Sequence, residues 1–388
     1  MKKIWILGLG LALAVCACGN QTQNTQESKE EELVVVNDHS NDGVLRVGIS
    51  MPSDSLERWK HDGEFLKKHL EEAGYKVDLA FSDNLIDTQI NDIEGLIENK
   101  ADVLLVTAVD GKSLTGVMKK AAEHDIPVIA YDRLIRDTPY VSAYVSYDNY
   151  RVGQLQGEYM RDALNLEHAG NKIYHVEFVS GDPADNNSLF FYQGAYDVLE
   201  PYMENGTIQV MSGQTDFYTT STAQWSSINA KSRMDILIGS YYSSGSTLHG
   251  VVCANDSTAL GTLMALEDSY RYENAVEVTG QDCDVANLQQ LMNGTQSMSV
   301  YKDLDQEALL AVQLTEAVLL EQSIQADLAS TMGIPCIYDD TSYENGIITV
   351  PSFLLEPETV TAENAEDILV NKYHSYELGP LGFERVSE

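Results

Sequence analysis

The sequence predicts an α/β protein of two doubly wound lobes, each built on a parallel sheet with helices on both faces. From residue 44 onward, a short β-branched run, a polar break and an amphipathic segment repeat along the chain. Alternating strands and helices imply parallel sheets that are covered on both sides. Ten strand candidates are about twice what one open sheet usually carries. The body of about 345 residues also exceeds what a single core usually serves.

The expected strands are short runs rich in Val, Ile, Tyr and Phe that end in polar residues. Between them, segments such as 56–74 and 89–101 place apolar residues at intervals of three and four, which predicts helices. We assign the strands up to residue 149 to the first lobe and those from 174 to 303 to the second. The candidates are residues 44–50, 76–82, 102–108, 126–132, 143–148, 174–180, 207–212, 250–256, 276–282 and 297–303.

Residues 1–17 are expected to be a signal peptide. Two lysines precede a mostly apolar run over residues 4–17, which is too short to cross a bilayer as a stable helix. Ala17, Cys18 and the Gly-Asn that follows resemble the site at which bacterial lipoproteins are cleaved and lipidated. Cys18 is therefore the expected lipidation site, and this lipid the only contact with a membrane. Lipidation at Cys16 and secretion without a lipid are the alternatives.

The charge of the chain is strongly acidic, with a formal net charge of −36. Residues 18–43 are polar and acid-rich, which predicts a flexible acidic tether rather than a folded element. A body of this charge is repelled by phosphates, so no nucleic-acid partner is expected. Solubility is the simplest role for the charge.

The cysteines and histidines give no metal or catalytic motif. Cys253, Cys283 and Cys336 lack metal-ligand spacing, and we expect buried thiols, with one disulfide pair as the alternative. The eight histidines are scattered and form no HExxH motif. No metal, no cofactor and no catalytic residue is therefore expected.

Polar side chains follow almost every expected strand, as Asp132 and Arg133 follow the run VIAY. In open α/β sheets, ligands bind beyond the carboxyl ends of the strands. Asp, Asn and Ser are also the favoured N-caps of the next helix, which accounts for roughly half of these residues. Arg58, Arg133 and Lys302 are not cap residues and point to a ligand instead.

The mixture of Asp, Asn, Gln and Arg at these strand ends suits a neutral polyol such as a monosaccharide. These side chains offer donors and acceptors at fixed geometry, and each sugar hydroxyl can both donate and accept. An anionic ligand would require an excess of bases or a phosphate-binding loop, and the sequence has no GxxxxGK[ST]. Sugars also pack their C–H faces on aromatic rings. The aromatic candidates are Trp59, Phe190, Phe191, Tyr218 and Trp225.

Eight short motifs resemble those of the xylose-type and multiple-monosaccharide-type sugar-binding proteins of the periplasmic-binding-protein type I family, which serve ABC transporters. The stretches DNNSLFFYQGA (185–195) and YENGIITVPSFLLEP (343–357) look most similar to the ChvE-type multiple-sugar-binding protein. The motifs are LERW (56–59), AYDRLI (130–135), SYDN (146–149), GDPADNN (181–187), LEPYMENG (199–206), AND (254–256), TGQDCD (279–284) and VYKD (300–303).

This resemblance implies two lobes joined by a three-crossing hinge, with crossings near residues 149, 304 and 346. The N-terminal lobe would comprise residues 44–149 and about 304–345. The C-terminal lobe would comprise residues 150–303 and about 346–388. The sugar contacts carried over by motif are Arg58, Asp132, Arg133, Asn187, Trp225, Asn255, Asp282 and Lys302.

The resemblance also implies the function. We expect an extracytoplasmic, lipid-anchored monomer, on the cell surface or the periplasmic side. It would capture an aldose such as xylose, arabinose, glucose or galactose and deliver it to an ABC transporter permease. AND looks xylose-type whereas the DNN context looks multiple-sugar-type, so the choice of sugar stays open.

The alternatives are a sugar or small-polyol sensor for signalling or chemotaxis, and a secreted sugar-acting enzyme. Acids beside Arg and Lys argue against the enzyme, because these bases lower the pKa that a general acid needs raised. A LacI-type repressor would carry a basic helix-turn-helix where this chain has the acidic tether.

Overall fold

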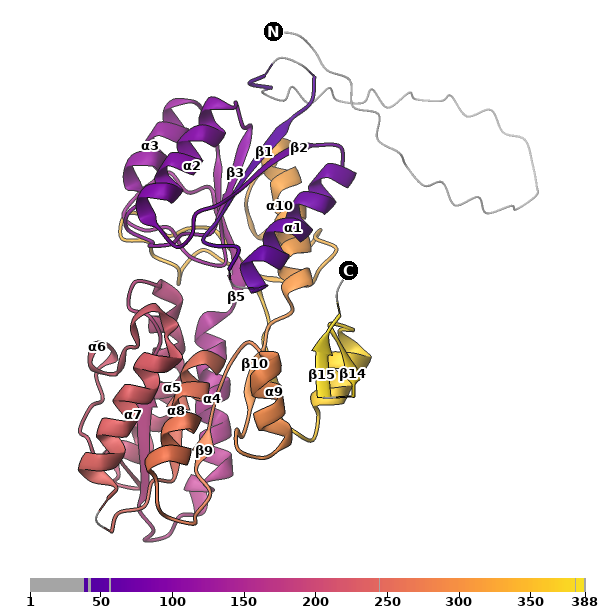
Figure 1. Cartoon of the computed structure of the whole chain (residues 1–388). Helices are drawn as coiled ribbons and strands as arrows, with labels where there is room; N and C mark the ends of the chain where they lie inside the picture. The colour runs from indigo at the N-terminus through magenta and orange to yellow at the C-terminus, as the bar shows by residue number, and fades with distance from the viewer. Residues whose placement is uncertain (1–37, 41–42, 56, 244, 381, 387–388) are drawn as a thin grey trace, which may run out of the picture.

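Figure 1 shows a computed structural model of the chain, in which two α/β lobes are stacked end to end. The structure describes residues 38–386 except 41–42, 56, 244 and 381. The expected signal peptide, the lipidation site Cys18 and most of the expected tether lie outside the described residues. No helix among the residues the structure describes is long and apolar enough to cross a membrane.

The N-terminal lobe is built on a seven-stranded sheet in the order β11-β12-β5-β4-β3-β1-β2. Every neighbouring pair is parallel except β11 and β12 at one edge. The strands are β1 (Arg46–Met51), β2 (Lys76–Phe81), β3 (Val103–Val106), β4 (Val128–Tyr131), β5 (Ala143–Tyr147), β11 (Ile337–Asp339) and β12 (Ser352–Leu355).

Helices cover both faces of this sheet. Apolar residues of α1 and α10 form one buried layer with the sheet, and those of α2 and α3 form the layer on the other face. The fully buried strands, such as β3 with the sequence VLLV, fit this arrangement because no strand face meets water. The helices are α1 (Glu57–Glu72), α2 (Ile86–Glu98), α3 (Thr115–Glu123), α10 (Leu304–Leu319) and the short α11 (Ala326–Ala329).

The C-terminal lobe has a four-stranded parallel sheet in the order β7-β6-β8-β9. Helices α4 and α5 pack on one face, and α7 and α8 pack on the other. The strands are β6 (Tyr174–Val179), β7 (Ile208–Gln209), β8 (Gly250–Cys253) and β9 (Glu277–Val278). The helices are α4 (Asn149–Ala163), α5 (Asn186–Glu204), α6 (Phe217–Thr220), α7 (Ser227–Tyr241) and α8 (Asp256–Ser269), with 3-10 turns at Leu166–His168 and Ala223–Trp225.

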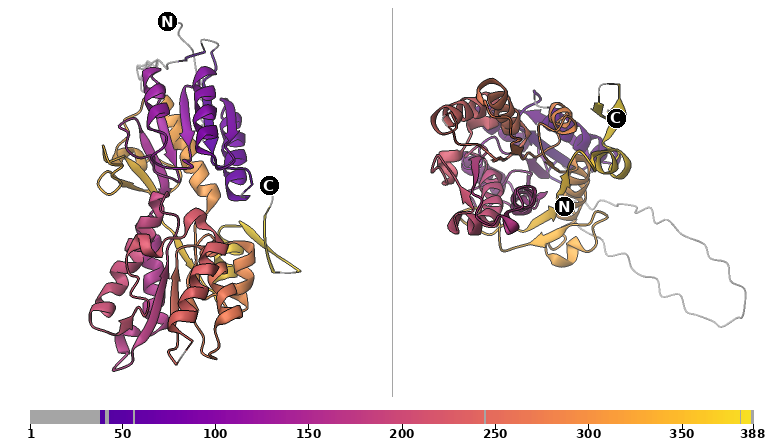
Figure 2. Two further views of the ribbon diagram at one scale, coloured as in Figure 1. Left: turned by 60° about the vertical axis from the view of Figure 1, so that its left-hand side comes forward. Right: turned by 90° about the horizontal axis from the view of Figure 1, so that it is seen from below.

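The last part of this lobe departs from a purely parallel arrangement. Strand β10 (Ser299–Tyr301) pairs antiparallel with β13 (Glu358–Val360), and a single parallel bridge between Gln281 and Val300 joins it to the segment that follows β9. Helix α9 (Val285–Met292), a π-helix (Glu366–Lys372) and an antiparallel hairpin of β14 (Tyr376–Gly379) and β15 (Gly382–Arg385) complete the lobe. Figure 2 shows this hairpin standing beside the C-terminal lobe.

The chain passes between the lobes after β5, after β10 and after β12. The expected third crossing near residue 346 is wrong, because β12 pairs in parallel with β5 of the N-terminal sheet. All four side chains of β12 are buried, so this strand completes the sheet beside β5. Residues 346–355 therefore belong to the N-terminal lobe, and the crossing falls between β12 and β13.

The three connections are tied together. The backbone N–H of Asp148 donates to the carbonyl of Leu355 at 2.9 Å, which joins the first connection to the third. The Tyr147 hydroxyl donates to the carbonyl of Asp303 at 2.9 Å, which joins the first to the second. The three connections thus form one hinge.

The first described residues lie beside the amino ends of the strands of the N-terminal sheet, on the side of this lobe opposite the hinge. Asp102, just before β3, accepts hydrogen bonds from the backbone N–H of His39 at 2.7 Å and of Arg46 at 2.6 Å. The amino ends of β1 and β3 lie here, whereas their carboxyl ends face the second lobe (Figure 1).

The three cysteines of the described chain are unpaired, as the first of the two expectations had it, and form no disulfide among themselves. Cys253, Cys283 and Cys336 are free thiols; the first two are buried and Cys336 is half-buried.

Candidate functional site

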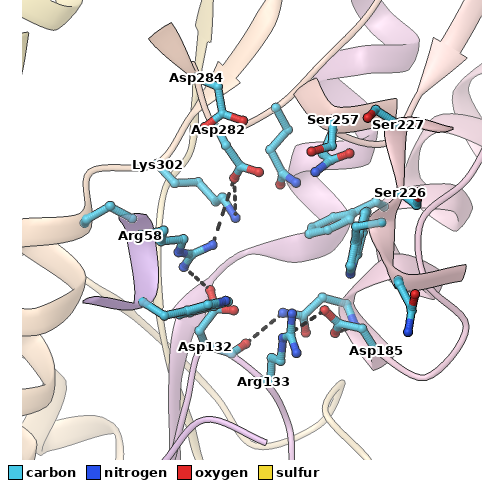
Figure 3. A pocket seen from close by; sticks show the side chains of 18 of the residues that line it. Arg58, Asp132, Arg133, Asp185, Ser226, Ser227, Ser257, Asp282, Asp284 and Lys302 are labelled. Atoms are coloured by element: carbon cyan, nitrogen blue, oxygen red, sulfur yellow. Dashed lines mark hydrogen bonds and ion pairs between the residues drawn. The ribbon is translucent and has the colours of Figure 1, made fainter. Parts of the chain in front are cut away.

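A cavity of about 490 Å³ lies between the lobes, where the carboxyl ends of the strands of both sheets meet. Figure 3 shows its side chains converging from both lobes. All eight residues expected to contact a sugar line this cleft: Arg58, Asp132, Arg133, Asn187, Trp225, Asn255, Asp282 and Lys302. The remaining lining residues are Trp59, Asp185, Phe191, Gln224, Ser226, Ser227, Ile228, Ser257, Gln281, Asp284, Leu304 and Arg385.

Arg58, in the first turn of α1, lies at the centre of a carboxylate cluster. Its Nη2 donates to Oδ2 of Asp132 and lies 3.3 Å from Oε2 of Glu307. Its Nη1 is 4.0 Å from Oδ1 of Asp282 on the opposite lobe. Burial alone would lower the pKa of Arg58, but the four surrounding carboxylates, with Asp132 and Glu307 the strongest, together outweigh burial and raise it. The guanidinium is therefore held as a permanent cation that reaches toward both lobes.

Two buried acids, Asp62 and Glu307, lie close to Arg58, and neither was predicted from the sequence. Oδ2 of Asp62 lies 3.6 Å from Arg58 Nε, and the side chains of Asp62 and Glu307 are inaccessible to solvent. Burial raises the pKa of Asp62 to about 6. Burial and repulsion by Asp132 raise the pKa of Glu307 well above its ordinary value. The spacing of four residues between Arg58 and Asp62 was a usable signal.

Asp132 has a left-handed backbone, with φ of +58°. Its carbonyl accepts hydrogen bonds from Tyr144 Oη at 2.6 Å, Ser146 Oγ at 3.2 Å and Asn187 Nδ2 at 2.7 Å. These bonds stabilise a conformation that is otherwise strained. Burial would raise the pKa of Asp132, but Arg58, Lys302 and Arg133 together outweigh burial, so the pKa is lowered and the side chain is a carboxylate.

Arg133 spans the cleft. Its Nε lies 3.2 Å from Oδ2 of Asp185, which caps α5 by accepting from the backbone N–H of Asn187 at 3.0 Å. Burial raises the pKa of Asp185, although Arg133 lowers it. The expectation that acids beside Arg and Lys have lowered pKa values therefore holds for Asp132 and fails for Asp185, where burial is the larger effect.

The opposite side of the cleft carries Asp282 and Lys302. Lys302 Nζ lies 3.1 Å from Oδ1 of Asp282 and 5.7 Å from the centre of the Phe191 ring. Asp282 and the next residue, Cys283, both have positive φ, at +93° and +54°. The backbone N–H of Asp282 donates to the carbonyl of Val300 at 2.9 Å, which fixes this turn beside β10.

Asn255 combines two roles that the sequence left as alternatives. It caps α8, with Oδ1 accepting from the backbone N–H of Thr258 at 3.0 Å. It also lines the cleft. Because the cap uses the amide oxygen, the amide nitrogen is the group that can donate to a ligand.

Two tryptophans form the apolar surfaces. The guanidinium carbons of Arg58 and Arg133 lie 4.4 Å and 5.1 Å from the centre of the Trp59 ring, so both cations are in contact with this ring. Trp225 ends the 3-10 turn Ala223–Trp225 with φ of +53° and packs over Gly181. A Cβ at Gly181 would stand 2.0 Å from the Trp225 ring, so only glycine leaves room for it.

Two of the aromatic candidates lie away from the cleft. Phe190 packs against Tyr343, with ring centres 5.0 Å apart, at the edge of the N-terminal core. Tyr218 is 73% exposed and does not line the cavity. Successive side chains of α5 point in different directions, so Phe191 faces the cleft whereas its neighbour Phe190 does not.

No group of three or more His, Cys, Asp or Glu residues among those described is arranged to hold a metal ion. The chemistry of the cleft is that of charged and amide hydrogen-bonding groups with aromatic faces. Such a set can bind and orient a polar, uncharged ligand.

Comparison with known proteins agrees with this geometry. Residues 47–323 match the periplasmic binding protein domain model. The chain is 36% identical over 329 residues to the multiple sugar-binding periplasmic protein SbpA of Azospirillum brasilense, covering 84% of this chain and 88% of that protein. It is 30% identical over 338 residues to the D-xylose-binding periplasmic protein of Escherichia coli, covering 87% and 93%.

A solved structure is similar over the same region. It is an ABC transporter solute-binding protein from Clostridium phytofermentans with bound β-D-glucose. The TM-score is 0.78 and the identity 42%, with 85% of this chain and 98% of that chain covered. The predicted fold class and the family resemblance are confirmed.

Proposed function

The chain belongs to the periplasmic binding protein family, and from that premise we propose that it captures an aldose between its lobes and delivers it to an ABC transporter. One observation carries the proposal: hydrogen-bonding side chains from both lobes converge on one cavity. The relatives named above bind sugars, and the similar solved structure holds β-D-glucose.

We assign the ligand contacts to the eight residues that the family motifs single out. Asp132, Asp282 and Asn255 would take hydroxyl groups at the two sheet ends. Arg58, Arg133 and Lys302 would donate charged hydrogen bonds, each held by a carboxylate within the site. Such bonds each contribute roughly 1.5–3 kcal/mol net. Asn187 would add an amide, and Trp225 would pack on the sugar's C–H face.

The mechanism is closure of the two lobes on the ligand. The sugar contacts both lobes together only in the closed form, so it favours this form by its differential affinity. A closed, loaded molecule presents a combined surface of both lobes that a permease can distinguish from the open one. A few well-placed contacts give micromolar affinity, which corresponds to about −8 kcal/mol.

Family members work outside the cytoplasm. For this chain we propose attachment to the membrane surface. A lipid on Cys18 and the acidic segment 18–43 would hold the body at the membrane surface, where the permease lies. The chain would act as a monomer.

A thermal-shift screen of common pentoses and hexoses tests the proposal. A sugar at a hundred times its Kd should raise the free energy of unfolding by about 2.7 kcal/mol. No shift with any aldose would contradict sugar capture. Release of a new product from glycosides would indicate the enzyme alternative instead. A sensor would bind sugar equally, so uptake of labelled sugar by cells with and without the gene separates transport from sensing.

A further inference from the structure

The C-terminal hairpin β14–β15 contributes to the cleft, although it lies outside the region that matches the family model. The hairpin packs on α9, and Tyr376 and Phe383 belong to the same buried cluster as Cys283. Cys283 directly follows Asp282, so the hairpin is packed against the turn that carries a proposed sugar ligand. Figure 1 shows the hairpin next to α9.

Tyr376 holds this turn directly. Its side chain is 1% exposed, and its hydroxyl donates to the carbonyl of Cys283 at 2.8 Å. Asp282 and Cys283 both have positive φ, a conformation that costs free energy for residues other than glycine. A hydrogen bond from a buried tyrosine therefore helps to keep Asp282 aimed into the cleft.

Arg385 extends the same network into the cavity. Its Nη2 donates to the Tyr376 hydroxyl at 2.8 Å, and its guanidinium carbon lies 5.0 Å from the centre of the Tyr376 ring. Arg385 also lines the cleft, as does Asp284. A guanidinium carries five N–H donors in a rigid fork, so it can bind a ligand hydroxyl while Tyr376 orients it.

Arg385 lies on the side of the cleft that faces α1 of the N-terminal lobe. The pKa of His61 on α1 is raised chiefly by its hydrogen bond to Asp305, and the positive charge of Arg385 opposes this shift. Asp284 and Arg385 both line the cleft, so an acid and a base are both available to a ligand. This balance suits a neutral hydroxyl-bearing group rather than an anion.

The cavity is large enough for a ligand that reaches this region. At about 30 Å³ for each of its twelve heavy atoms, the share of one water molecule, a hexose fills at most roughly 360 Å³. The cavity measures about 490 Å³. A pentose lacks the hydroxymethyl group and would leave still more of it to water.

We propose that the hairpin is a working part of the sugar site, in which Arg385 is a specificity-determining residue that binds the hydroxymethyl-side oxygen of an aldohexose. Tyr376 is then a positioning residue that orients both Arg385 and the Asp282 turn. The inference rests on the proposed capture of an aldose and names its class: hexoses are preferred over the pentoses that lack this group.

Titration calorimetry with two sugar pairs that differ only by a hydroxymethyl group tests the inference. The pairs are D-glucose with D-xylose and D-galactose with L-arabinose. Arg385→Ala should weaken hexose binding by about fivefold or more and pentose binding by less than about twofold. Arg385→Lys should recover part of the hexose affinity. Tyr376→Phe should weaken both members of each pair, since Asp282 serves both, and should weaken hexose binding more, because Arg385 loses the hydroxyl that orients it.

Glu377→Ala is the matched control, because it alters an exposed side chain on the same hairpin. It should leave both affinities unchanged. Equal losses for hexose and pentose in Arg385→Ala, or no loss, would overturn the assignment of Arg385. If Arg385→Ala does not fold, as judged by circular dichroism, the ratio measured for Arg385→Lys decides. A wild-type chain that binds neither pair contradicts the proposed function instead.

Discussion

Arg133 of the N-terminal lobe and Asp185 of the C-terminal lobe form an ion pair across the cleft, with 3.2 Å between Nε and Oδ2. The pair brings the two rims of the cleft together at a point that also lines the cavity. A ligand bound at this point therefore contacts side chains of both lobes at once.

Arg133→Ala should weaken sugar binding by at least about tenfold while the fold is retained, because a charged hydrogen bond is lost and Asp185 is left buried without its cation. Titration calorimetry measures the affinity, and circular dichroism checks the fold. Arg136→Ala is the control: Arg136 Nη1 also bridges the lobes, to Asn186 Oδ1 at 2.8 Å, but does not line the cavity. Similar losses in both variants would mean that Arg133 acts only on closure.

Asp62→Asn should make the unliganded protein more stable at neutral pH. The folded-state pKa of Asp62 is about 6, above its ordinary value of 3.8. Between these two pH values, the folded chain therefore keeps a proton on Asp62 that the unfolded chain has lost. Its free energy of unfolding therefore falls as pH rises from about 4 to 6, and the ionised carboxylate costs about 3 kcal/mol above that range. The gain from Asp62→Asn should be largest at pH 8 and vanish near pH 4.

Urea unfolding at these two pH values measures the effect. Glu64→Gln, at an exposed position of the same helix, should change the stability little at either pH. A stabilisation by Asp62→Asn that is equal at both pH values would contradict the assigned protonation.

Gly181→Ala should displace the Trp225 ring, because the new Cβ would stand 2.0 Å from ring carbons. Loss of the aromatic face should weaken sugar binding by roughly five- to tenfold. Trp59 and Trp225, the tryptophans among the described residues, both line the cleft, so tryptophan emission should change as well. Gly239→Ala, in a helix with open space around the position, is the control and should bind normally. Unchanged binding in Gly181→Ala would remove Trp225 from the ligand contacts.

Cys18→Ser should release the protein from the membrane if the lipid is its only attachment. Phase separation in a cloud-point detergent gives the readout: the wild-type chain made in its host should enter the detergent phase, and the variant the aqueous phase. Continued membrane association of the variant would point to Cys16 or to another anchor.

The alternation of strands and helices was sufficient to predict the two-lobed fold, but not the course of the chain after α10. The run SFLL of β12 is buried throughout, and a continuous apolar run is equally suited to either sheet. Its pairing with β5 depends on which sheet edge is open, and this is a property of the assembled lobe. The antiparallel pairing of β10 with β13 is equally non-local, since these strands are far apart in the sequence.

Site residues could be predicted from the sequence where the residue type is not one that caps helices. Arg58, Arg133 and Lys302 all line the cleft. Other polar residues after strands are turn or cap residues instead: Asp110 and Asp148, for example, accept hydrogen bonds from nearby backbone N–H groups. The buried acids around Arg58 were missed because Glu307 lies in an ordinary amphipathic helix whose buried face only the packing reveals. Arg385 has no local signal at all, and its role depends on where the hairpin docks.

The bonds from His39 and Arg46 to Asp102 place the beginning of the described chain at the pole of the N-terminal lobe farthest from the cleft. A flexible tether attached at this pole would be far from the cleft and would leave both lobes free to open and close. Opening and closing would then proceed without pulling on the attachment, so the molecule could load and unload without leaving its place on the cell.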